Sequence, residues 1–552
     1  MKKSYLIVLT FVFLLGTLLS FYRLTKTPPC LNWDETSFAY NAYSILKTGK
    51  DEYGVSFPVQ FKSVGDYKFP LFIYSLVPII KVFGLTEFSV RLLPALLGSI
   101  SILLIFFLSL ELFKSPIAAL FSAFFFAVSP WHLQFSRAGA DVGVSSFFVI
   151  LGILGFARAI NQKKFGFILS FISFTAALYT YYGERVFIPL FLTLCLFYFR
   201  TEIKKRLKTF LRAGLITLAL LIPMFHSAVS SGQQEKFLKT TIFGYTRSED
   251  YLNQLISEDK SYLVTQVFHS APLEYSLAVV DHYLNHFSPN FLFTQGPTLD
   301  KRQFIFDMGM MYLLEIPLLL MGVFLLLKKK SKLAIFVLLW LLIAPIPAAI
   351  TRDPVHARRA LNMVPPLMLI LGVGGGWCWE KINAIKKRRV RVVTVGLSGL
   401  VILFFLSFYL LSYYVFTPER TYKGAGGWQC GYKELVNYLS PIKDNYKNII
   451  IDTSYQGPYI FFLFYEKYPP ELYQPQARLV QESPDMLGEG AGYDNYAFRP
   501  IYWPDDRWLR NTLFVGPPER LPEKDFAEVG AKIIKKIFFA NGEIAFLIVS
   551  TF

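Results

Sequence analysis

Behind an apolar run at residues 5–21, the chain reads Pro28-Pro29-Cys30-Leu31-Asn32-Trp33-Asp34-Glu35-Thr36. An uninterrupted run of this kind matches the hydrocarbon core of a bilayer, which is about 30 Å thick. No small-x-small cleavage site follows it, so we expect a retained membrane helix and not a signal peptide. The pair Asp34-Glu35 then falls just outside the bilayer. Carboxylates gain nothing from lipid headgroups there, but they are well suited to accepting a proton.

The composition predicts a polytopic α-helical membrane protein. Of the 552 residues, 53% are hydrophobic and 17% are charged, whereas soluble domains are normally about 25% charged. Long apolar runs account for this deficit of charge. They predict a bundle of eleven spans, at residues 5–21, 88–112, 117–135, 141–158, 165–181, 184–199, 209–226, 308–327, 333–350, 358–378 and 391–414.

The net charge of +17 is unevenly distributed along the chain. Six short segments hold 22 of the 56 Lys and Arg residues but only two of the 39 Asp and Glu residues: 1–4, 113–116, 157–165, 200–212, 328–332 and 380–391. Basic clusters between apolar runs are typical of cytoplasmic loops. A groove for a polyphosphate would concentrate the charge differently, so we expect membrane lipids and no nucleic acid as partners.

All six basic segments fall on one side if the N-terminus is cytoplasmic. Eleven spans then place the C-terminus outside a plasma membrane that the chain crosses many times. We predict a membrane domain at 1–414 with large outer loops at 22–87 and 227–307, and a small extracytoplasmic α/β domain at 415–552. A loop as long as 227–307 is unusual unless it is functional, so we expect it to cover a site.

Local patterns predict further elements on the outer side. A helix is expected from Asn32 to Leu46, with Gly49 at its end. The apolar stretch Phe69–Phe83 is short for a span and is expected to lie in the membrane interface. After a linker at Gly424–Gly427, the tail is predicted to form helices at 432–439 and 458–465 and strands at 448–452, 512–515, 532–539 and 544–549, the last two joined by an Asn-Gly turn.

Four cysteines are too few and too scattered for a disulfide framework or a metal cluster. Cys195 and Cys378 fall in apolar runs and are expected in the core. Cys30 and Cys430 both fall on the outer side, where a bridge between them is one possibility.

Two interpretations of Asp34-Glu35 compete. Acidic residues in the first turn of a helix stabilise it through capping and through the helix dipole. The same geometry points the two side chains about 100° apart, because successive residues of a helix are rotated by that angle. One carboxylate could then face a cleft at the membrane surface and deprotonate a hydroxyl, while the other holds its neighbour.

Three more motifs accompany the acidic pair. They are Asp66-Tyr67-Lys68-Phe69-Pro70, Phe83-Gly84-Leu85-Thr86-Glu87-Phe88-Ser89-Val90-Arg91-Leu92-Leu93-Pro94, and Ser129-Pro130-Trp131-His132-Leu133-Gln134-Phe135-Ser136-Arg137-Ala138-Gly139-Ala140-Asp141. Together these motifs resemble the GT-C integral-membrane glycosyltransferases. They are most similar to the dolichyl-phosphate-mannose protein mannosyltransferase and aminoarabinose lipid A transferase superfamily, over roughly residues 1–380.

The resemblance implies an inverting enzyme that moves one sugar, a hexose or a pentose, from a polyprenyl-phosphate donor. The acceptor would be a protein, lipid or glycan on the outer face. Asp34 would be the general base, and Glu35 would bind donor or acceptor. Lys68 would meet the carrier phosphate. The resemblance also places Arg137 and Asp141 in the cavity. From its position alone, Lys68 could simply extend to the headgroup level, or it could contact a lipid phosphate with Asp66 lining the same pocket. The aminoarabinose enzymes have an acid immediately before the lysine, whereas this chain has Tyr67.

Cations on the outer side suit the anionic leaving group of such a donor. Arg352, His356, Arg358 and Arg359 lie between the predicted ninth and tenth spans, and Glu184-Arg185 lies beside a run of tyrosines. The plainer interpretations are headgroup contact or pairing with Asp353 for the first group, and a local ion pair for the second. Three arginines in an outer loop run against the positive-inside rule, which favours a functional use.

Other functions and a metal stay open at this point. A divalent ion could bind among outer residues, namely His226, His269, His282, His286, Asp281 and Asp300, although their spacing shows no site and no cofactor is firmly implied. A transporter or flippase for a lipid-linked sugar is one alternative, but transporters usually carry paired repeats and polar groups at the bilayer midplane. A non-catalytic envelope assembly protein is another.

Overall fold

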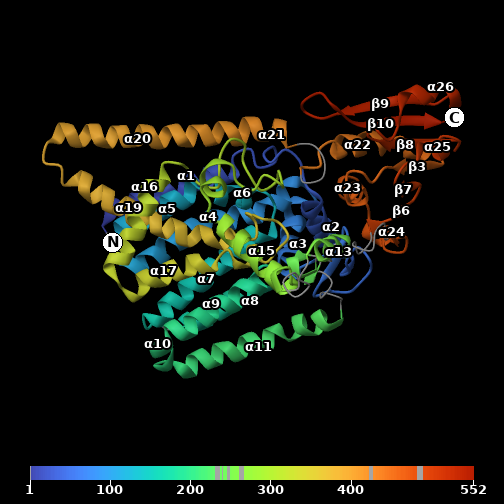
Figure 1. Cartoon of the computed structure of the whole chain (residues 1–552). Coiled ribbons are helices and arrows are strands. Elements are labelled where there is room, and N and C mark those ends of the chain that lie inside the picture. The colour runs from blue at the N-terminus through green and yellow to red at the C-terminus, as the bar shows by residue number, and fades with distance from the viewer. Residues whose placement is uncertain are drawn as a thin grey trace.

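The structure is a computed structural model that describes residues 2–163, 165–230, 237–238, 240–244, 249–259, 267–421, 427–480 and 489–551. A helical bundle forms one end of the molecule, and a small α/β domain caps the other end (Figure 1). The bundle helices are α1 (Lys3–Phe21), α4 (Glu87–Phe113), α5 (Pro116–Val128), α6 (Pro130–Arg137), α7 (Asp141–Ile160), α8 (Gly166–Leu178), α9 (Glu184–Tyr198), α10 (Arg200–Lys204), α11 (Leu207–Ser230), α16 (Glu315–Lys329), α17 (Lys332–Ile343), α18 (Ile346–Ala349), α19 (Val364–Asn383) and α20 (Arg388–Leu411).

Within the described residues, seven helices are long and apolar enough to cross a membrane. An eighth arises if α5 and α6, which meet at a bend of 54°, count as one broken span. The other three predicted spans, 165–181, 184–199 and 308–327, correspond to α8, α9 and α16, which have 13, 15 and 15 residues. A polytopic α-helical membrane protein is therefore confirmed, whereas the count of eleven spans stays a prediction.

The outermost helices of the bundle present apolar side chains to the surroundings. In the apolar stretch of the span that contains α20, 6% of the residues are buried inside the protein, and in that of α11 17% are buried. The corresponding share for the span that contains α19 is 83%. Both exposed helices lie at the edges of the bundle (Figure 1). Apolar side chains on such faces are stable in contact with lipid and costly in water.

Helix α19 crosses the bundle centre because small residues let it approach its neighbours. A Cβ built on Gly372 would lie 1.9 Å from Ser122 Oγ of α5, and one on Gly374 would lie 2.1 Å from the carbonyl oxygen of Leu318 on α16. Close backbone approach of this kind is how membrane helices gain packing energy without a hydrophobic drive between them. The α19 backbone thereby fixes the loop that precedes it.

Two helices and a hairpin fill the first large loop. They are α2 (Trp33–Thr48), β1 (Phe61–Ser63), β2 (Asp66–Lys68) and α3 (Pro70–Phe83). The expected helices at Asn32–Leu46 and Phe69–Phe83 are thus confirmed, and Gly49 ends α2 with a φ of 69°. The apolar face of α2 packs on α3 and on the α/β domain through Phe38, Ala42 and Ile45.

The second large loop contains α13 (Glu249–Glu258), α15 (Ala271–Asn285) and a π-helical turn, η2 (Asn290–Thr294). The same loop holds a short turn, η1 (Ile242–Gly244), and further short turns are η3 (Leu361–Met363), η4 (Ser412–Phe416) and α21 (Thr417–Arg420). Because η4 and α21 continue α20, the last bundle helix extends to Arg420, beyond the predicted end at 414.

The α/β domain is a six-stranded mixed sheet in the order β6-β7-β3-β8-β10-β9. Its strands are β3 (Asn448–Ile451), β6 (Gly492–Tyr493), β7 (Tyr496–Phe498), β8 (Thr512–Gly516), β9 (Lys532–Phe538) and β10 (Ile544–Thr551). A further pair is formed by β4 (Leu479–Val480) and β5 (Glu489–Gly490). The helices and remaining turns are α22 (Tyr432–Leu439), η5 (Lys443–Asn445), α23 (Pro458–Tyr465), α24 (Pro470–Tyr473), α25 (Trp503–Asp506), η6 (Glu523–Asp525) and α26 (Phe526–Val529).

Every element predicted in the tail is present within one or two residues, and the Asn541-Gly542 turn joins β9 to β10. Most of the expected linker, 424–426, lies outside the described residues. The domain is tied to the first loop by a disulfide between Cys30 and Cys430, the bridge that the sequence left open. Tyr459 of α23 adds hydrogen bonds to that loop, donating to Glu52 Oε1 at 3.0 Å and accepting from the Val64 amide at 3.0 Å.

Candidate functional site

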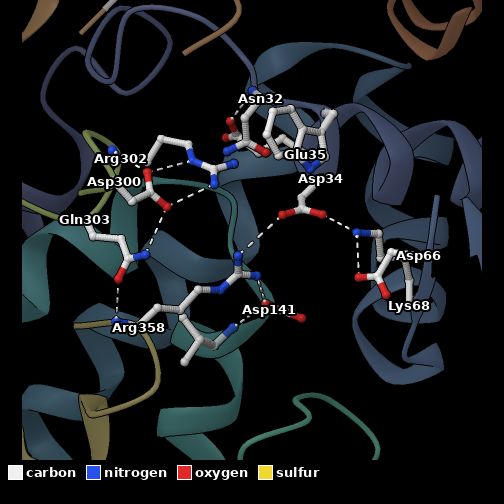
Figure 2. Close-up of polar contacts among 12 residues, drawn as sticks. Asn32, Asp34, Glu35, Asp66, Lys68, Asp141, Asp300, Arg302, Gln303 and Arg358 are labelled. Carbon is white, nitrogen blue, oxygen red and sulfur yellow. Dashed lines mark hydrogen bonds and ion pairs between the residues drawn. The ribbon is translucent and has the colours of Figure 1, made fainter. Parts of the chain in front are cut away.

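The start of α2 is fixed by a capping box. The Asn32 side chain accepts a hydrogen bond from the Glu35 amide, and the Glu35 carboxylate accepts one from the Asn32 amide, both at 3.0 Å. A reciprocal cap of this kind satisfies two amides that the helix leaves unpaired. It turns Glu35 back toward the helix start and leaves Asp34 pointing in another direction, as Figure 2 shows. The capping interpretation therefore applies to Glu35 and Asn32.

Glu35 is buried at 1% exposure and pairs with Arg91 of α4. Arg91 Nε donates to Glu35 Oε1 at 2.8 Å, and its terminal nitrogens donate to the carbonyl oxygens of Leu24, Pro28 and Cys30 at 3.0, 2.8 and 2.7 Å. The pair thus secures the segment that leads from α1 to α2. Glu35 does not line the cavity described next. The geometry gives it a structural role, and its expected contact with donor or acceptor stays a prediction.

A cavity of about 280 Å³ opens in front of Asp34. Seven of the residues predicted from the sequence line it: Asp34, Asp66, Lys68, Asp141, His356, Arg358 and Arg359. Aromatic side chains form much of the remaining wall, namely Phe38, Tyr67, Phe69, Tyr181 and Tyr182. Aromatic faces beside charged groups suit a ligand that combines a sugar ring with a phosphate.

Asp34 lies between two cations in this cavity (Figure 2). Lys68 Nζ contacts Oδ1 of Asp34, and Arg358 Nη1 lies 3.3 Å from Oδ2. The other terminal nitrogen of Arg358 lies 2.5 Å from Asp141 Oδ1. Arg358 thereby bridges carboxylates from α2 and α7, which the sequence places far apart. The fork of a guanidinium makes such a bridge, and an ammonium group does not reproduce it.

The hairpin of β1 and β2 places the side chains of Asp66 and Lys68 next to each other. Their side chains project to the same face because they are two residues apart on a strand, and Lys68 Nζ lies 3.4 Å from Asp66 Oδ2. The turn at Val64-Gly65, with φ of 48° and 62°, sends the strand back beside Phe61–Ser63. The intervening Tyr67 therefore does not separate the acid from the lysine.

The charges of the site reinforce one another. Burial alone would raise the pKa of Asp34, but Lys68, Arg358 and Arg302 outweigh it and hold that pKa below its ordinary value. Burial opposes the charge of Lys68, but Asp34 and Asp66 raise its pKa. Burial and the nearby arginines lower the pKa of His356. Asp34 is therefore an anion flanked by fixed cations, and His356 is neutral.

Four other predicted residues lie outside the cavity lining. Arg137 is fully buried and donates to the carbonyl oxygens of Ser20, Tyr22 and Thr27 at 2.9, 2.7 and 2.8 Å. This second arginine secures the chain after α1 and does not line the cavity as expected. Glu184 accepts hydrogen bonds from Ser145 and Asn362 inside the bundle. Neither Arg137 nor Glu184 is among the residues that line the cavity, and their contact with substrate stays a prediction.

Arg185 and Arg352 are the other two predicted site residues that lie outside the cavity lining. The Arg185 guanidinium lies over the Phe69 ring at 4.3 Å, so it contacts the wall of the cavity from behind. Arg352 is exposed, and its amide donates to the carbonyl of Thr240. Arg359 does line the cavity, and it also pairs with Asp353 at 3.3 Å, the plainer alternative for this loop.

The metal interpretation finds no support in the part of the chain that the structure describes, where no group of three His, Cys, Asp or Glu side chains is placed to hold an ion. The histidines instead hold the loop that carries Arg358. His282 Nδ1 lies 3.0 Å from the Thr351 carbonyl oxygen, and His286 Nε2 accepts from the His356 amide at 3.1 Å. Asp300 pairs with Arg302 at 2.9 Å.

Comparison with known proteins agrees with this arrangement. The sequence profile of the family described as dolichyl-phosphate-mannose-protein mannosyltransferase matches residues 68–226. ArnT from Cupriavidus metallidurans in the apo state has a TM-score of 0.57 at 12% identity, covering 99% of this chain and 98% of that one. ArnT bound to undecaprenyl phosphate has a TM-score of 0.56 at 11% identity, with coverage of 100% and 98%.

An oligosaccharyltransferase from Archaeoglobus fulgidus, tethered with an acceptor peptide, is also similar. Its TM-score is 0.50 at 15% identity, and the match covers 85% of this chain but 63% of that one. This chain therefore spans less than two thirds of the length of the archaeal protein. No curated protein matches the chain by sequence at a significant level. These likenesses establish the fold, which is that of the GT-C integral-membrane glycosyltransferases, and confirm the resemblance drawn from the sequence motifs.

Proposed function

We propose that this protein is an inverting glycosyltransferase that moves one sugar from a polyprenyl-phosphate donor to an acceptor at the membrane surface. The observation that carries the proposal is the placement of Asp34 between Lys68 and Arg358 in an aromatic-walled cavity beside the bundle. A base and two phosphate-binding cations are the groups that displacement at an anomeric carbon requires. The fold of the chain is consistent with this assignment.

In the proposed reaction, an acceptor hydroxyl attacks the anomeric carbon while the bond from that carbon to the phosphate oxygen breaks. The hydroxyl proton passes to Asp34. The electron pair of the broken bond leaves with the polyprenyl phosphate, whose added negative charge is stabilised by Lys68 and Arg358. Phe69 and Tyr182, whose nearly parallel rings have centroids 6.2 Å apart, both line the cavity and offer aromatic surface to a sugar.

Donor binding also changes how strong a base Asp34 is. In the free protein, both oxygens of Asp34 contact cations, so the carboxylate is a weak base. The phosphodiester of the donor carries one negative charge, as a carboxylate does, and its two non-bridging oxygens compete for the same cations. As Lys68 and Arg358 turn to the donor, an oxygen of Asp34 becomes available and its pKa rises. The proposed order is therefore donor first and acceptor second.

The proposed setting is a bacterial-type plasma membrane with the cavity on the outer face. The basic segments within α10 and before α20 lie at the end of the bundle opposite the α/β domain (Figure 1). By the positive-inside rule, that end faces the cytoplasm together with the N-terminus. The cavity lies toward the α/β domain and so faces outward.

Purified protein tests the function directly. It is offered a panel of polyprenyl-phosphate hexoses and pentoses with protein, lipid and glycan acceptors, and products are read by mass spectrometry. Transfer that depends on both donor and acceptor supports the proposal. Movement of an intact lipid-linked sugar across proteoliposomes, without any change in its bonds, would instead establish a flippase.

A further inference from the structure

The segment Asp300–Gln303, which precedes α16, connects the two sides of the Asp34 site (Figure 2). Neither Asp300 nor Gln303, the two ends of this segment, lines the cavity. We infer that Asp300 and Gln303 are positioning residues, which hold Asp34 and Arg358 in the relative placement that sugar transfer needs. The inference rests on the proposed function and assigns it two residues that no motif of the sequence indicates.

The first branch of this connection reaches the α2 side of the site. Asp300 Oδ1 accepts from Arg302 Nε at 3.0 Å, and Oδ2 accepts from Arg302 Nη2 at 2.9 Å. A bidentate pair fixes the plane of a guanidinium as well as its position. Arg302 is thereby held 4.5 Å over the ring of Trp33, the residue immediately before Asp34. Asp300 thus acts on the start of α2 through Arg302 and Trp33.

The second branch reaches the loop that carries Arg358. Gln303 Nε2 donates to Asp300 Oδ2 at 2.9 Å, and Gln303 Oε1 accepts from the Arg358 amide at 3.2 Å. The same amide nitrogen of Gln303 lies 3.2 Å from His356 Nε2. Gln303 is 5% exposed, so water does not replace these contacts readily. Its side chain therefore sets where the Arg358 backbone begins its reach toward Asp34.

The connecting segment is itself anchored to the bundle. The carbonyl oxygen of Arg302 accepts a hydrogen bond from Gln134 Nε2 of α6 at 2.6 Å. One segment fixed to the bundle thus contacts both the residue before Asp34 and the backbone of Arg358. A shift of about 1 Å at such a support can cost about 100-fold in rate, because the reacting groups lose alignment.

The two branches differ in what they do to the charge on Asp34. The charged groups that face Asp34 are Lys68 from β2, Arg358 from the loop before α19, and Arg302, with Asp66 and Asp141 behind the first two. Asp300 holds Arg302 near Asp34, whereas Gln303 is uncharged and contacts Asp300, His356 and the backbone of Arg358. Removing Asp300 therefore changes both alignment and charge, and replacing Gln303 with another uncharged residue changes alignment without changing the net charge of the site.

This difference between Asp300 and Gln303 can be tested, because a merely structural role would not change the pH profile of one variant and leave that of the other unchanged. The full-length variants Asp300→Asn, Asp300→Glu and Gln303→Met are assayed for kcat, donor KM and the pH profile, with Asp307→Asn as the matched control. Asp307 lies in the same loop, is 64% exposed and pairs only with the surface residue Arg420 among the contacts described. Binding of undecaprenyl phosphate, measured by native mass spectrometry, is the probe that does not depend on turnover.

We expect kcat to fall about 100-fold in Asp300→Asn and in Gln303→Met, with partial recovery in Asp300→Glu. The acid limb of the profile should shift in Asp300→Asn, because the charge around Asp34 changes, and stay in place in Gln303→Met. Wild-type kcat in folded Asp300→Asn and Gln303→Met would overturn the inference. An identical pH profile in the wild type and all three variants would also overturn it. Should Asp300→Asn not fold, Gln303→Met decides alone. A wild-type protein that binds undecaprenyl phosphate but transfers no sugar would refute the proposed function, and altered binding in the variants would then still show positioning of Arg358.

Discussion

The guanidinium of Arg358 lies 3.3 Å from the carboxylate of Asp34, although 324 residues separate the two along the chain. Lys68 contacts the other oxygen of the same carboxylate. The site is therefore assembled from three parts of the chain, namely the start of α2, the strand before α3 and the loop before α19. Their convergence on Asp34 makes its environment the feature from which most consequences follow.

Replacing Arg358 with lysine should separate the effect of its positive charge from the effect of its forked shape. In Arg358→Lys the positive charge remains, but one ammonium cannot bridge Asp34 and Asp141 as the fork does. We expect undecaprenyl phosphate to bind at least about 10-fold more weakly, since a charge-assisted contact contributes about 1.5–3 kcal/mol. Microscale thermophoresis in detergent measures this. Equal affinity in wild type and variant would show that Arg358 does not meet the phosphate.

The pair of Glu35 and Arg91 should matter for stability and not for substrate binding. Glu35→Gln leaves a buried guanidinium without its counter-charge, a loss of about 3–5 kcal/mol in comparable buried pairs. Thermal unfolding followed by intrinsic fluorescence should show a large drop in midpoint, with donor KM little changed in the folded fraction. A raised donor KM at wild-type stability would restore Glu35 as a ligand.

The buried carboxyl of Glu52 predicts a dependence of stability on pH. Burial raises its pKa to about 8 from 4.5, while hydrogen bonds from Ser63 and Tyr459 oppose the shift. Because the folded pKa lies above the unfolded value, folding takes up a proton, and stability falls as the pH rises from about 4.5 through 8. Glu52→Gln should remove this loss, giving an unfolding midpoint that is higher than wild type at pH 8 and similar at pH 5. Parallel pH curves for the two proteins would exclude Glu52 as the cause.

The disulfide between Cys30 and Cys430 should hold the α/β domain against the first loop. The bridge closes a chain segment of 400 residues, and native disulfides typically contribute about 2–4 kcal/mol. In Cys430→Ser, we expect faster cleavage near the domain junction during limited proteolysis. Cys378→Ser removes a free thiol of the bundle and is the matched control. Unchanged cleavage in Cys430→Ser would mean that packing alone secures the domain.

Features that depend on neighbouring residues were predictable from the sequence. Asn32 and Gly49 delimit α2 through local hydrogen bonds and a left-handed φ, and both can be recognised from residue type and spacing. The helices and strands of the tail follow their patterns for the same reason. Asp34, Asp66, Lys68 and Arg358 were expected at the site, and all four line the cavity.

Features created by tertiary contact were not predictable. Arg91 is one polar residue in an apolar helix, and nothing local shows that Glu35 is its partner. The role of Asp300 and Gln303 depends on the fold bringing Trp33 and the Arg358 backbone to opposite sides of them. The predicted span 165–181 runs past the end of α8 at Leu178, and the predicted span 308–327 begins before α16, which starts at Glu315. In both places the side chains stay largely apolar or aromatic through a turn that flanks the helix.

The central claim is that Asp34 is the base for sugar transfer, and a single-turnover assay of Asp34→Asn tests it most directly. The variant keeps the shape of the side chain, and Lys68 and Arg358 keep Asp66 and Asp141 as counter-charges. Undecaprenyl phosphate should therefore still bind, and the unfolding midpoint should fall less than in Glu35→Gln. We predict that the rate of transfer from a polyprenyl-phosphate sugar falls by about 10²–10⁴-fold, the usual contribution of general base catalysis. Transfer at the wild-type rate by folded Asp34→Asn would contradict the account.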